Sequence, residues 1–335
     1  MGTKIAYTGC HFPQGIQDEI ARYFNEKGYA VEIIRPKSRD AWDSRDMLLG
    51  YEAIICSGEA YRKETISFLS PTLRILSRHG IGTDEIHKEA ATELGIAVCN
   101  AAGTLSYCVA ECALSLILNT LHGYNAADRD VRDGLWNKNS AFTRELRGMT
   151  VGLIGFGGIA QQLAVLLSAF NCTVLAADPF FDTQAAERLS VERADIARIR
   201  EECDVISVHV PLTDETRGMI DTNFLLGMKR GAIIINTSRG GVIVERDLVE
   251  ALNTGVIAGV GLDVFEQEPV DGKNPLLRIR NTMLLPHIAA HTYDSQLEAG
   301  LMACRNAVAI MEGGEPESLL NPEYRNNIRK GADNL

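Results

Sequence analysis

Three polar residues in the second half of the chain have the types and positions needed for proton and hydride chemistry. Arg239, Asp263 and His287 each follow an apolar run of strand-like composition. Because the carboxyl ends of parallel strands meet at one edge of a sheet, we expect these side chains to converge. An imidazole can donate a proton to a keto oxygen near neutral pH and accept it in the reverse direction. A guanidinium can bind a substrate carboxylate as a two-pronged fork.

A carboxylate beside the imidazole would fix one ring tautomer and stabilise the charged ring. Glu266 and Glu268 are equally good candidates by residue type. Asp263 could contact a nicotinamide amide, cap a turn or form a local ion pair, and His287 could also be a hydrogen-bonded core histidine. The spacing of His287 and His291 resembles a pair of metal ligands, but Pro286 and the lack of a third ligand nearby argue against zinc. We therefore expect no metal site.

A glycine-rich stretch could bind the dinucleotide that such chemistry requires. Residues 151–160 predict a strand, a turn at Gly155 and Gly157, and a helix packed closely through Ala160. Backbone N–H groups at the helix start would face the phosphates of a dinucleotide. The next strand ends at Asp178, whose carboxylate can accept both ribose hydroxyl hydrogens and would repel a 2′-phosphate. This pattern favours NAD over NADP, although Asp178 could also be an ordinary acid at a strand end.

The elements around these residues alternate between strand and helix. Strands are predicted over 4–7, 30–34, 53–56, 73–77 and 96–99, and again over 151–154, 173–177, 204–210, 232–236 and 257–262. Helices are predicted over 16–26, 43–49, 83–94, 105–121 and 294–311. This alternation is typical of an α/β fold with doubly wound parallel sheets that are covered on both faces.

A loop in the first half also leaves a strand at its carboxyl end: Arg78, His79, Gly80, Ile81 and Gly82. Its glycines would let backbone N–H groups converge on an anion, although a plain strand-to-helix turn fits equally well. Residues 123–147 could form an arm that packs on a second subunit or a surface excursion. The polar tail from residue 313 is expected to be loosely held.

Composition excludes several classes of protein. The 335 residues suffice for two domains, and the net charge of −11 argues against a nucleic-acid partner. No apolar run reaches the roughly 18 residues that span a bilayer, and the start carries no signal-peptide core. Ala6 stands where a myristoylation signal would have Ser or Thr. The eight cysteines include no C-x-x-C pair, so we expect reduced thiols in a cytoplasmic protein, with Cys108 and Cys112 serving helix packing.

Seven stretches, read in order, resemble the D-2-hydroxyacid dehydrogenase family, which includes phosphoglycerate, glycerate, D-lactate and hydroxypyruvate-reducing enzymes. They are 76–84, 109–111, 146–148 with the adjoining glycine motif, 203–212, 235–241, 262–269 and 286–290. The resemblance implies an NAD-dependent oxidoreductase that interconverts a D-2-hydroxy acid and its 2-keto acid. It implies Arg239, Glu268 and His287 as the catalytic trio, and so selects Glu268 over Glu266.

The resemblance also implies the binding residues. The loop from Arg78 to Gly82 would hold the substrate carboxylate through backbone N–H groups, and His291 would lie near the substrate and tune which substituent fits. Cofactor contacts are expected from ten residues: Gly155, Gly157, Gly158, Ile159, Asp178, His209, Pro211, Thr216, Thr237 and Asp263. The chain departs from the family at Gly158, where a basic residue is common, so one positive contact to the pyrophosphate is missing.

Family resemblance further implies a discontinuous architecture. Residues 1–100 with 288–335 would form a flavodoxin-like substrate domain, and 101–287 an inserted Rossmann-type NAD domain. Substrate would bind in a cleft that closes by hinge motion, and the protein would be a homodimer. The chain ends without the regulatory domain of longer phosphoglycerate dehydrogenases. Two alternatives stay open: a nucleotide-sensing corepressor of the same family, and a formate or phosphite dehydrogenase of the same fold.

Overall fold

The computed structural model describes residues 4–138 and 143–328, which divide into two compact units. Unit 1 comprises the chain up to Leu105 and from His291 onward, and unit 2 comprises Ser106–Ala290. The chain therefore passes out of unit 1 and returns to it, with unit 2 inserted between the two crossings. The sequence prediction put these crossings at 100/101 and 287/288.

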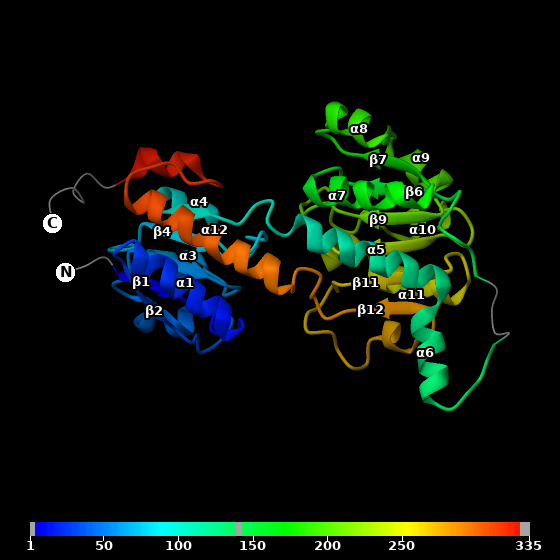
Figure 1. Cartoon of the computed structure of the whole chain (residues 1–335), viewed down its shortest axis with the longest axis horizontal. Coiled ribbons are helices and arrows are strands. Elements are labelled where there is room, and N and C mark those ends of the chain that lie inside the picture. Colours follow the sequence, from blue (N-terminus) through cyan, green and yellow to red (C-terminus); the bar gives the residue numbers. More distant parts are fainter. Residues whose placement is uncertain (1–3, 139–142, 329–335) are drawn as a thin grey trace. The chain divides into compact units, whose positions relative to one another are not determined.

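Unit 1 is built on a five-stranded parallel sheet in the order β2-β1-β3-β4-β5. Its strands are β1 (Lys4–Tyr7), β2 (Ala30–Ile33), β3 (Ala53–Cys56), β4 (Ile75–Arg78) and β5 (Ala97–Cys99). One face is covered by α1 (Gln14–Glu26) and α12 (Tyr293–Met311), which pack side by side (Figure 1). The other face carries α2 (Arg45–Leu48), α3 (Lys63–Leu69) and α4 (Lys88–Glu93).

The alternation of side chains along each strand supplies both faces of this sheet. Ile5 and Tyr7 enter the core beneath α1 and α12, whereas Ala6 enters the core on the opposite face. The inner strand β3 is apolar and buried along its whole length, as expected for a parallel sheet covered on both sides, whereas the edge strand β2 is largely exposed and contains Glu32.

Unit 2 contains a seven-stranded parallel sheet in the order β12-β11-β10-β9-β6-β7-β8. Its strands are β6 (Thr150–Ile154), β7 (Thr173–Ala177), β8 (Glu192–Arg193), β9 (Val205–Val208), β10 (Ile233–Asn236), β11 (Gly259–Leu262) and β12 (Thr282–Leu284). The chain runs outward from β6 to β8 and then resumes at β9 on the other side of β6. The carboxyl ends of β6 and β9 therefore flank the topological switch point, where such sheets bind ligands.

Helices cover both faces of the second sheet (Figure 1). One face packs against α5 (Ser106–His122), α7 (Gly158–Leu167) and α8 (Thr183–Leu189), and the other against α9 (Ile196–Glu202), α10 (Thr222–Leu226) and α11 (Glu245–Asn253). A further helix, α6 (Tyr124–Arg132), follows α5. The predicted α/β class with two parallel sheets is confirmed.

Two sequence predictions about local structure were wrong. The helix expected over 83–94 begins only at Lys88, because 83–87 form a turn and His87 Nδ1 accepts a hydrogen bond from Ala90 N at 3.2 Å. The tail after α12 is not loosely held as far as residue 328. Asn321 is buried, and its side chain accepts a hydrogen bond from Val98 N at 2.7 Å and donates to Ile96 O at 2.9 Å.

The arm and the tail named in the sequence analysis lie partly outside the described residues. The structure does not describe positions 139–142 of the arm, positions 329–335 of the tail or the first three residues. Within the ranges that are described, no helix combines the length and apolar character needed to cross a membrane.

Candidate active site

The predicted histidine and one of the two candidate acids form a close pair in unit 2. His287, which follows β12, lies with its Nδ1 2.7 Å from Glu268 Oε2, while Glu268 Oε1 accepts a hydrogen bond from Phe265 N at 3.1 Å. Glu266 points elsewhere, because its Oε1 accepts from Glu245 N at the start of α11 at 3.0 Å. The structure therefore brings Glu268, and not Glu266, to the imidazole.

Arg239 is brought to the same edge of the sheet by a close backbone approach. It follows β10, and the Asn236 side chain donates to its carbonyl at 2.9 Å. A Cβ on the next residue, Gly240, would lie 1.9 Å from the Phe265 carbonyl carbon. Only glycine permits this contact between the segments that follow β10 and β11, and the Arg239 charge acts on both His287 and Glu268 as a result.

The backbone at His287 is unusual and is held by Asp263. His287 has a φ of 57°, a left-handed conformation that costs a non-glycine residue about 1–3 kcal/mol. The Asp263 carbonyl accepts from His287 N at 2.8 Å, and its two carboxylate oxygens accept from Ile288 N at 2.7 Å and Ala289 N at 2.9 Å. Three consecutive N–H groups are thus bound by one residue, which stabilises the strained turn.

The pKa values of His287 and Glu268 are shifted in opposite directions. The hydrogen bond to Glu268 raises the pKa of His287, outweighing the opposing effect of burial. Burial alone would raise the pKa of Glu268, but the His287 hydrogen bond and that from Phe265 N hold it below its usual range. Burial raises the pKa of Asp263 despite its two backbone donors. Together, these shifts favour a charged imidazolium beside an ionised Glu268.

The glycine turn has the geometry that a bound dinucleotide requires. Gly155 has a φ of 94°, and a Cβ there would lie 2.8 Å from His209 O, so the turn can close only with glycine. A Cβ at Gly157, in contrast, would meet no described atom within 4 Å, so the backbone there is open to a ligand. Gly158 and Ile159 form the first turn of α7, directly after this opening.

A cavity of about 650 Å³ lies beside this turn, within unit 2. Asp178, Pro179 and Thr216 contribute to its wall, as do Arg193, Ile196 and Met219. The Asp178 carboxylate is fixed at its mouth, because its two oxygens accept hydrogen bonds from Phe156 N and Phe180 N, each at 2.7 Å. The volume and this acid suit the adenosine half of a dinucleotide.

Three further predicted cofactor residues lie at strand ends nearby. His209 follows β9 and bonds through Nε2 to Ser207 Oγ at 2.9 Å, and burial lowers its pKa to about 4. Pro211 O accepts from Thr216 Oγ1 at 2.6 Å, which folds the segment between them. Thr237 is buried after β10, and its Oγ1 has no hydrogen-bond partner within the described ranges. The buried Thr237 hydroxyl is therefore available to hydrogen-bond a bound cofactor, and these three residues fit a dinucleotide.

The predicted substrate loop lies in unit 1, after β4, and all five of its carbonyls accept hydrogen bonds. The donors are Gly80 N for Arg78, the Arg78 guanidinium for His79 and Gly82, Ala101 N for Gly80, and Asn100 Nδ2 for Ile81. Within the described part of the chain, the N–H groups of Ile81 and Gly82 form no hydrogen bond. The loop therefore presents donors without competing acceptors, as an anion-binding backbone nest does.

The side chains of the loop are turned away from this role. Arg78 donates to backbone carbonyls, including Gly82 O at 3.1 Å. His79 is buried, with Nε2 donating to Gln296 O at 2.7 Å and Nδ1 3.2 Å from the Tyr7 hydroxyl, and burial lowers its pKa to about 3. His291 is exposed just before the N-cap of α12.

Sequence reasoning missed several residues of these sites. Arg193 and Met219 line the cavity, and Asn100 holds the substrate loop. Asn100 follows β5, so the rule that polar residues at the carboxyl ends of parallel strands are candidates would have found it. In the described part of the chain, no cluster of His, Cys, Asp and Glu could hold a metal ion.

Comparisons with known proteins found a matching family model and several similar relatives. A model for the "D-isomer specific 2-hydroxyacid dehydrogenase, NAD binding domain" matches residues 114–289. D-3-phosphoglycerate dehydrogenase of Archaeoglobus fulgidus is 36% identical over 89% of this chain, which spans only 56% of that relative. Glyoxylate reductase of Thermofilum pendens is 36% identical over 91% of this chain and 94% of the relative.

Solved structures share the whole architecture. The TT0316 protein from Thermus thermophilus superimposes with a TM-score of 0.86 at 28% identity, covering 95% of this chain and 100% of its own. A glyoxylate reductase from Paecilomyes thermophila gives a TM-score of 0.84 at 27% identity, covering 96% and 99%. The resemblance drawn from the seven motifs is confirmed.

The Asp263 contacts lead to a prediction about the turn at His287. In Asp263→Asn, one of the two backbone N–H groups loses its acceptor, so we expect a loss of about 1–3 kcal/mol in unfolding free energy. Amide hydrogen exchange at Ile288 and Ala289 should accelerate. The control is Asp271→Asn, since Asp271 Oδ1 accepts from Lys273 N at an exposed site where water can replace it. Equal exchange in the two variants would contradict the assignment.

Proposed function

The chain belongs to the D-isomer specific 2-hydroxyacid dehydrogenase family, and we propose that it interconverts a D-2-hydroxy acid and its 2-keto acid with NAD. The observation that carries this proposal is the 2.7 Å contact between His287 and Glu268 beside Arg239, at the carboxyl edge of a dinucleotide-binding sheet. When bound, the nicotinamide supplies or accepts the hydride. The protein's own side chains manage the proton and the substrate carboxylate.

His287 is the proposed acid and base. Its Nδ1 is engaged by Glu268, which leaves Nε2 for the substrate oxygen. In reduction, the imidazolium gives its Nε2 proton to the keto oxygen, and in oxidation the neutral ring removes the hydroxyl proton. Glu268 holds the ring orientation and stabilises the charged form, and the raised pKa of His287 supports this role.

Two groups are proposed to bind the substrate carboxylate. Arg239 offers a guanidinium fork, which suits a planar carboxylate. The N–H groups of Ile81 and Gly82 offer a neutral nest. The His79 imidazole and the Arg78 guanidinium support the loop rather than contact substrate, because both are engaged with backbone carbonyls.

NAD is the proposed cofactor. Asp178 supports it, since the two backbone donors fix its carboxylate at the cavity where an adenosine ribose would lie. A carboxylate there would accept ribose hydroxyl hydrogens and repel a 2′-phosphate. Asp263 is proposed to face the nicotinamide in addition to holding the His287 turn, and Thr237 to offer its buried hydroxyl to the cofactor.

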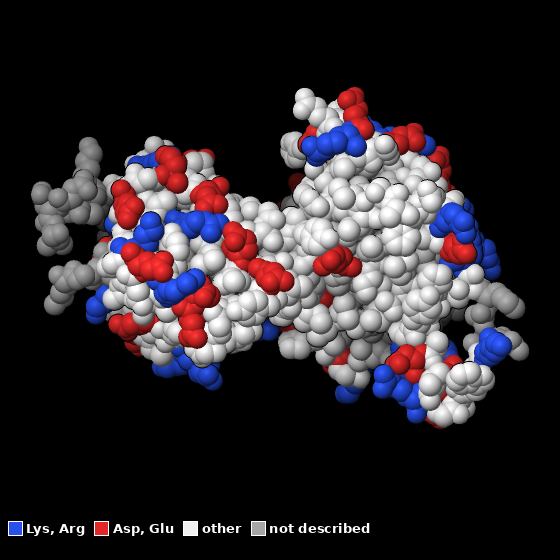
Figure 2. Space-filling view, in the orientation of Figure 1, with Lys and Arg blue, Asp and Glu red and all other residues white. Residues whose placement is uncertain are grey.

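A homodimer is the proposed assembly. The face of unit 2 over α5 and α7 carries few charged side chains (Figure 2). Tyr107 and Val165 are exposed there, and Val131 and Trp136 are exposed on and after α6. A weakly charged face with exposed apolar side chains is the kind of surface that a second subunit can cover. The eight cysteines are all free, which supports a cytoplasmic location.

The alternative functions named in the sequence analysis predict different results in an activity assay. A nucleotide-sensing corepressor would bind NADH without consuming it, whereas an oxidoreductase would lower absorbance at the NADH band when offered a suitable 2-keto acid. A formate or phosphite dehydrogenase would act on those acids and on no 2-keto acid. The complete set of His287, Glu268 and Arg239 supports the 2-hydroxyacid reaction.

The shifted pKa of His287 leads to a pH prediction. Reduction needs the protonated ring, and the raised pKa keeps it protonated to higher pH. Glu268→Gln removes the charge that stabilises the imidazolium, so the alkaline limb of the kcat/KM profile for keto-acid reduction should move to lower pH. An unmoved alkaline limb in the Gln variant would refute the pairing.

His287→Ala should lower turnover roughly 10²–10⁴-fold while NADH binding is retained.

Asp178 is tested through cofactor preference. Asp178→Ala should lower the ratio of kcat/KM for NADH over NADPH roughly 10- to 100-fold, because two charge-assisted hydrogen bonds are lost. The matched control is Asp195→Asn, which removes a charge from the same cavity while keeping an effective N-cap on α9. A ratio that changes equally in the two variants would argue against a ribose contact at Asp178.

His291 is tested through substrate preference. The charges of His291, Arg78 and Arg39 all act on His11, so these four groups lie near one another around the carboxyl edge of the sheet in unit 1. The Glu59 carboxylate acts on His11 as well, and Arg78 is engaged with backbone carbonyls, so we propose that the exposed His291 is the group that binds a second anionic group on the substrate. A panel of keto acids assayed with NADH should show His291→Ala losing several-fold more kcat/KM for anionic than for apolar substituents. An unchanged ranking would exclude this role.

A further inference from the structure

The residues that follow β5 hold the substrate loop through hydrogen bonds to its carbonyl oxygens. Asn100 Nδ2 donates to Ile81 O at 2.8 Å, and Ala101 N donates to Gly80 O at 2.9 Å. Both contacts occupy carbonyls whose peptide planes also carry the N–H groups of Gly82 and Ile81. Since a peptide is planar, fixing each carbonyl fixes the direction of the N–H on the following residue.

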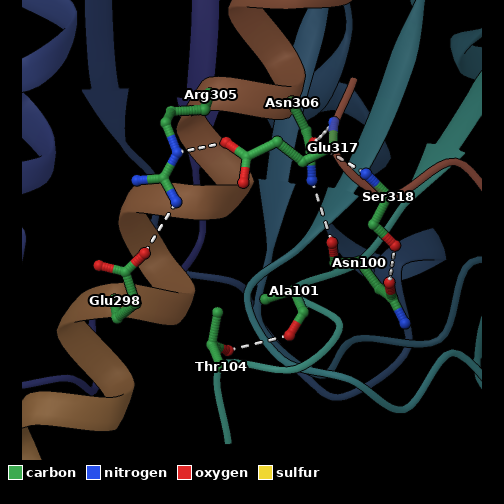
Figure 3. Close-up of polar contacts among 8 residues, drawn as sticks. All are labelled: Asn100, Ala101, Thr104, Glu298, Arg305, Asn306, Glu317 and Ser318. Atoms are coloured by element: carbon green, nitrogen blue, oxygen red, sulfur yellow. Dashed lines mark hydrogen bonds and ion pairs between the residues drawn. The ribbon is translucent and has the colours of Figure 1, made fainter. Parts of the chain in front are cut away.

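The Asn100 side chain is itself held by the segment after α12 (Figure 3). Its Oδ1 accepts a hydrogen bond from Ser318 Oγ, so the amide can present only its NH₂ group to Ile81. The Asn100 carbonyl accepts from Asn306 Nδ2 at 3.0 Å. Ala101 is also fixed, since its carbonyl accepts from Thr104 Oγ1 at 2.9 Å.

Asn306 and Ser318 are joined by a hydrogen bond. Asn306 is fully buried on α12, and its Oδ1 accepts from Glu317 N at 2.8 Å and Ser318 N at 3.3 Å (Figure 3). Arg305 adds ion pairs to Glu317 and Glu298, which are partly exposed and so contribute little to stability. Ser318 is therefore held by the buried amide of Asn306 and, through its neighbour Leu320, whose N–H donates to Val98 O at 2.9 Å, by β5.

We propose that Ser318 and Asn306 are positioning residues for the substrate: through Asn100, they set the direction of the N–H groups of Ile81 and Gly82. This inference rests on the proposed function, in which that loop binds the substrate carboxylate. It gives the segment after α12, which lies far from the loop in the sequence, an indirect part in substrate affinity, through Asn100.

The physical reason is the polarity of the Asn100 amide. Without the Ser318 hydroxyl, Oδ1 loses its donor and the amide is free to rotate. A rotated amide would turn Oδ1 toward the Ile81 carbonyl, where two acceptors repel each other and the carbonyl loses its donor. The peptide between Ile81 and Gly82 would then turn, and its N–H would leave the direction that a carboxylate needs.

The test compares Ser318→Ala with Ser318→Thr in the full chain. The Ala variant should raise KM for the best 2-keto acid roughly tenfold, which corresponds to about 1.4 kcal/mol, with the dissociation constant for NADH unchanged. The Thr variant keeps the hydroxyl and should restore KM to within about twofold of the parent. Hydrogen exchange at Ala101, whose N–H donates to Gly80 O, should accelerate in the Ala variant only.

The matched control is Asn321→Ala. Asn321 is also buried in the segment after α12 and bonds to Val98 N, Ile96 O and Thr92 Oγ1, all of them outside the loop. The substitution should lower the melting temperature without changing KM. An equal rise in KM for Asn321→Ala and Ser318→Ala, or no rescue by Ser318→Thr, would overturn the inference.

The two proposals fail in different ways. If the parent protein reduces no 2-keto acid, the proposed function fails, and the hydrogen exchange at Ala101 still decides whether Ser318 controls the loop. If the parent is active and both KM and exchange are unaltered in Ser318→Ala, only the positioning role fails.

Discussion

The geometry of the turn at His287 depends on one buried carboxylate, that of Asp263. Asp263 binds the N–H groups of Ile288 and Ala289, and its carbonyl binds that of His287, so a left-handed histidine is held at the end of β12. The imidazole can then reach Glu268, which comes from the segment after β11. Loss of these contacts would release the strained turn, and the shifts in pKa that suit His287 to proton transfer would be lost with it.

Hydrogen bonds also fix the backbone of the candidate substrate loop in unit 1, and there they occupy carbonyl oxygens rather than N–H groups. There, each carbonyl of the loop from Arg78 to Gly82 is occupied by a donor, and among the described residues the N–H groups of Ile81 and Gly82 are left over. Backbone N–H groups that converge in this way can bind an anion, and we propose that these two donors do so. In the proposed function, unit 2 contributes a proton donor and a cation, and unit 1 contributes a neutral backbone nest for a carboxylate.

Much of this arrangement could be predicted from sequence, for a physical reason. Apolar runs that end in Arg239, Asp263 and His287 indicate parallel strands, and parallel strands place their ends together. The choice between Glu266 and Glu268 could not be made from residue type, because it depends on which acid turns toward the start of α11. The turn at 83–87, the docking of Asn321 and the role of Asn100 were missed, since each depends on partners that pattern and periodicity do not reveal.

The proposed function requires the His287 ring to act on a substrate oxygen while Glu268 holds its other nitrogen. The sharpest test is a crystal structure with NAD⁺ and an unreactive 2-keto acid analogue. We expect His287 Nε2 within hydrogen-bond distance of the analogue's keto oxygen, about 2.6–3.2 Å, with Glu268 retained on Nδ1. An analogue bound away from His287, or an imidazole that has left Glu268 in the complex, would contradict it.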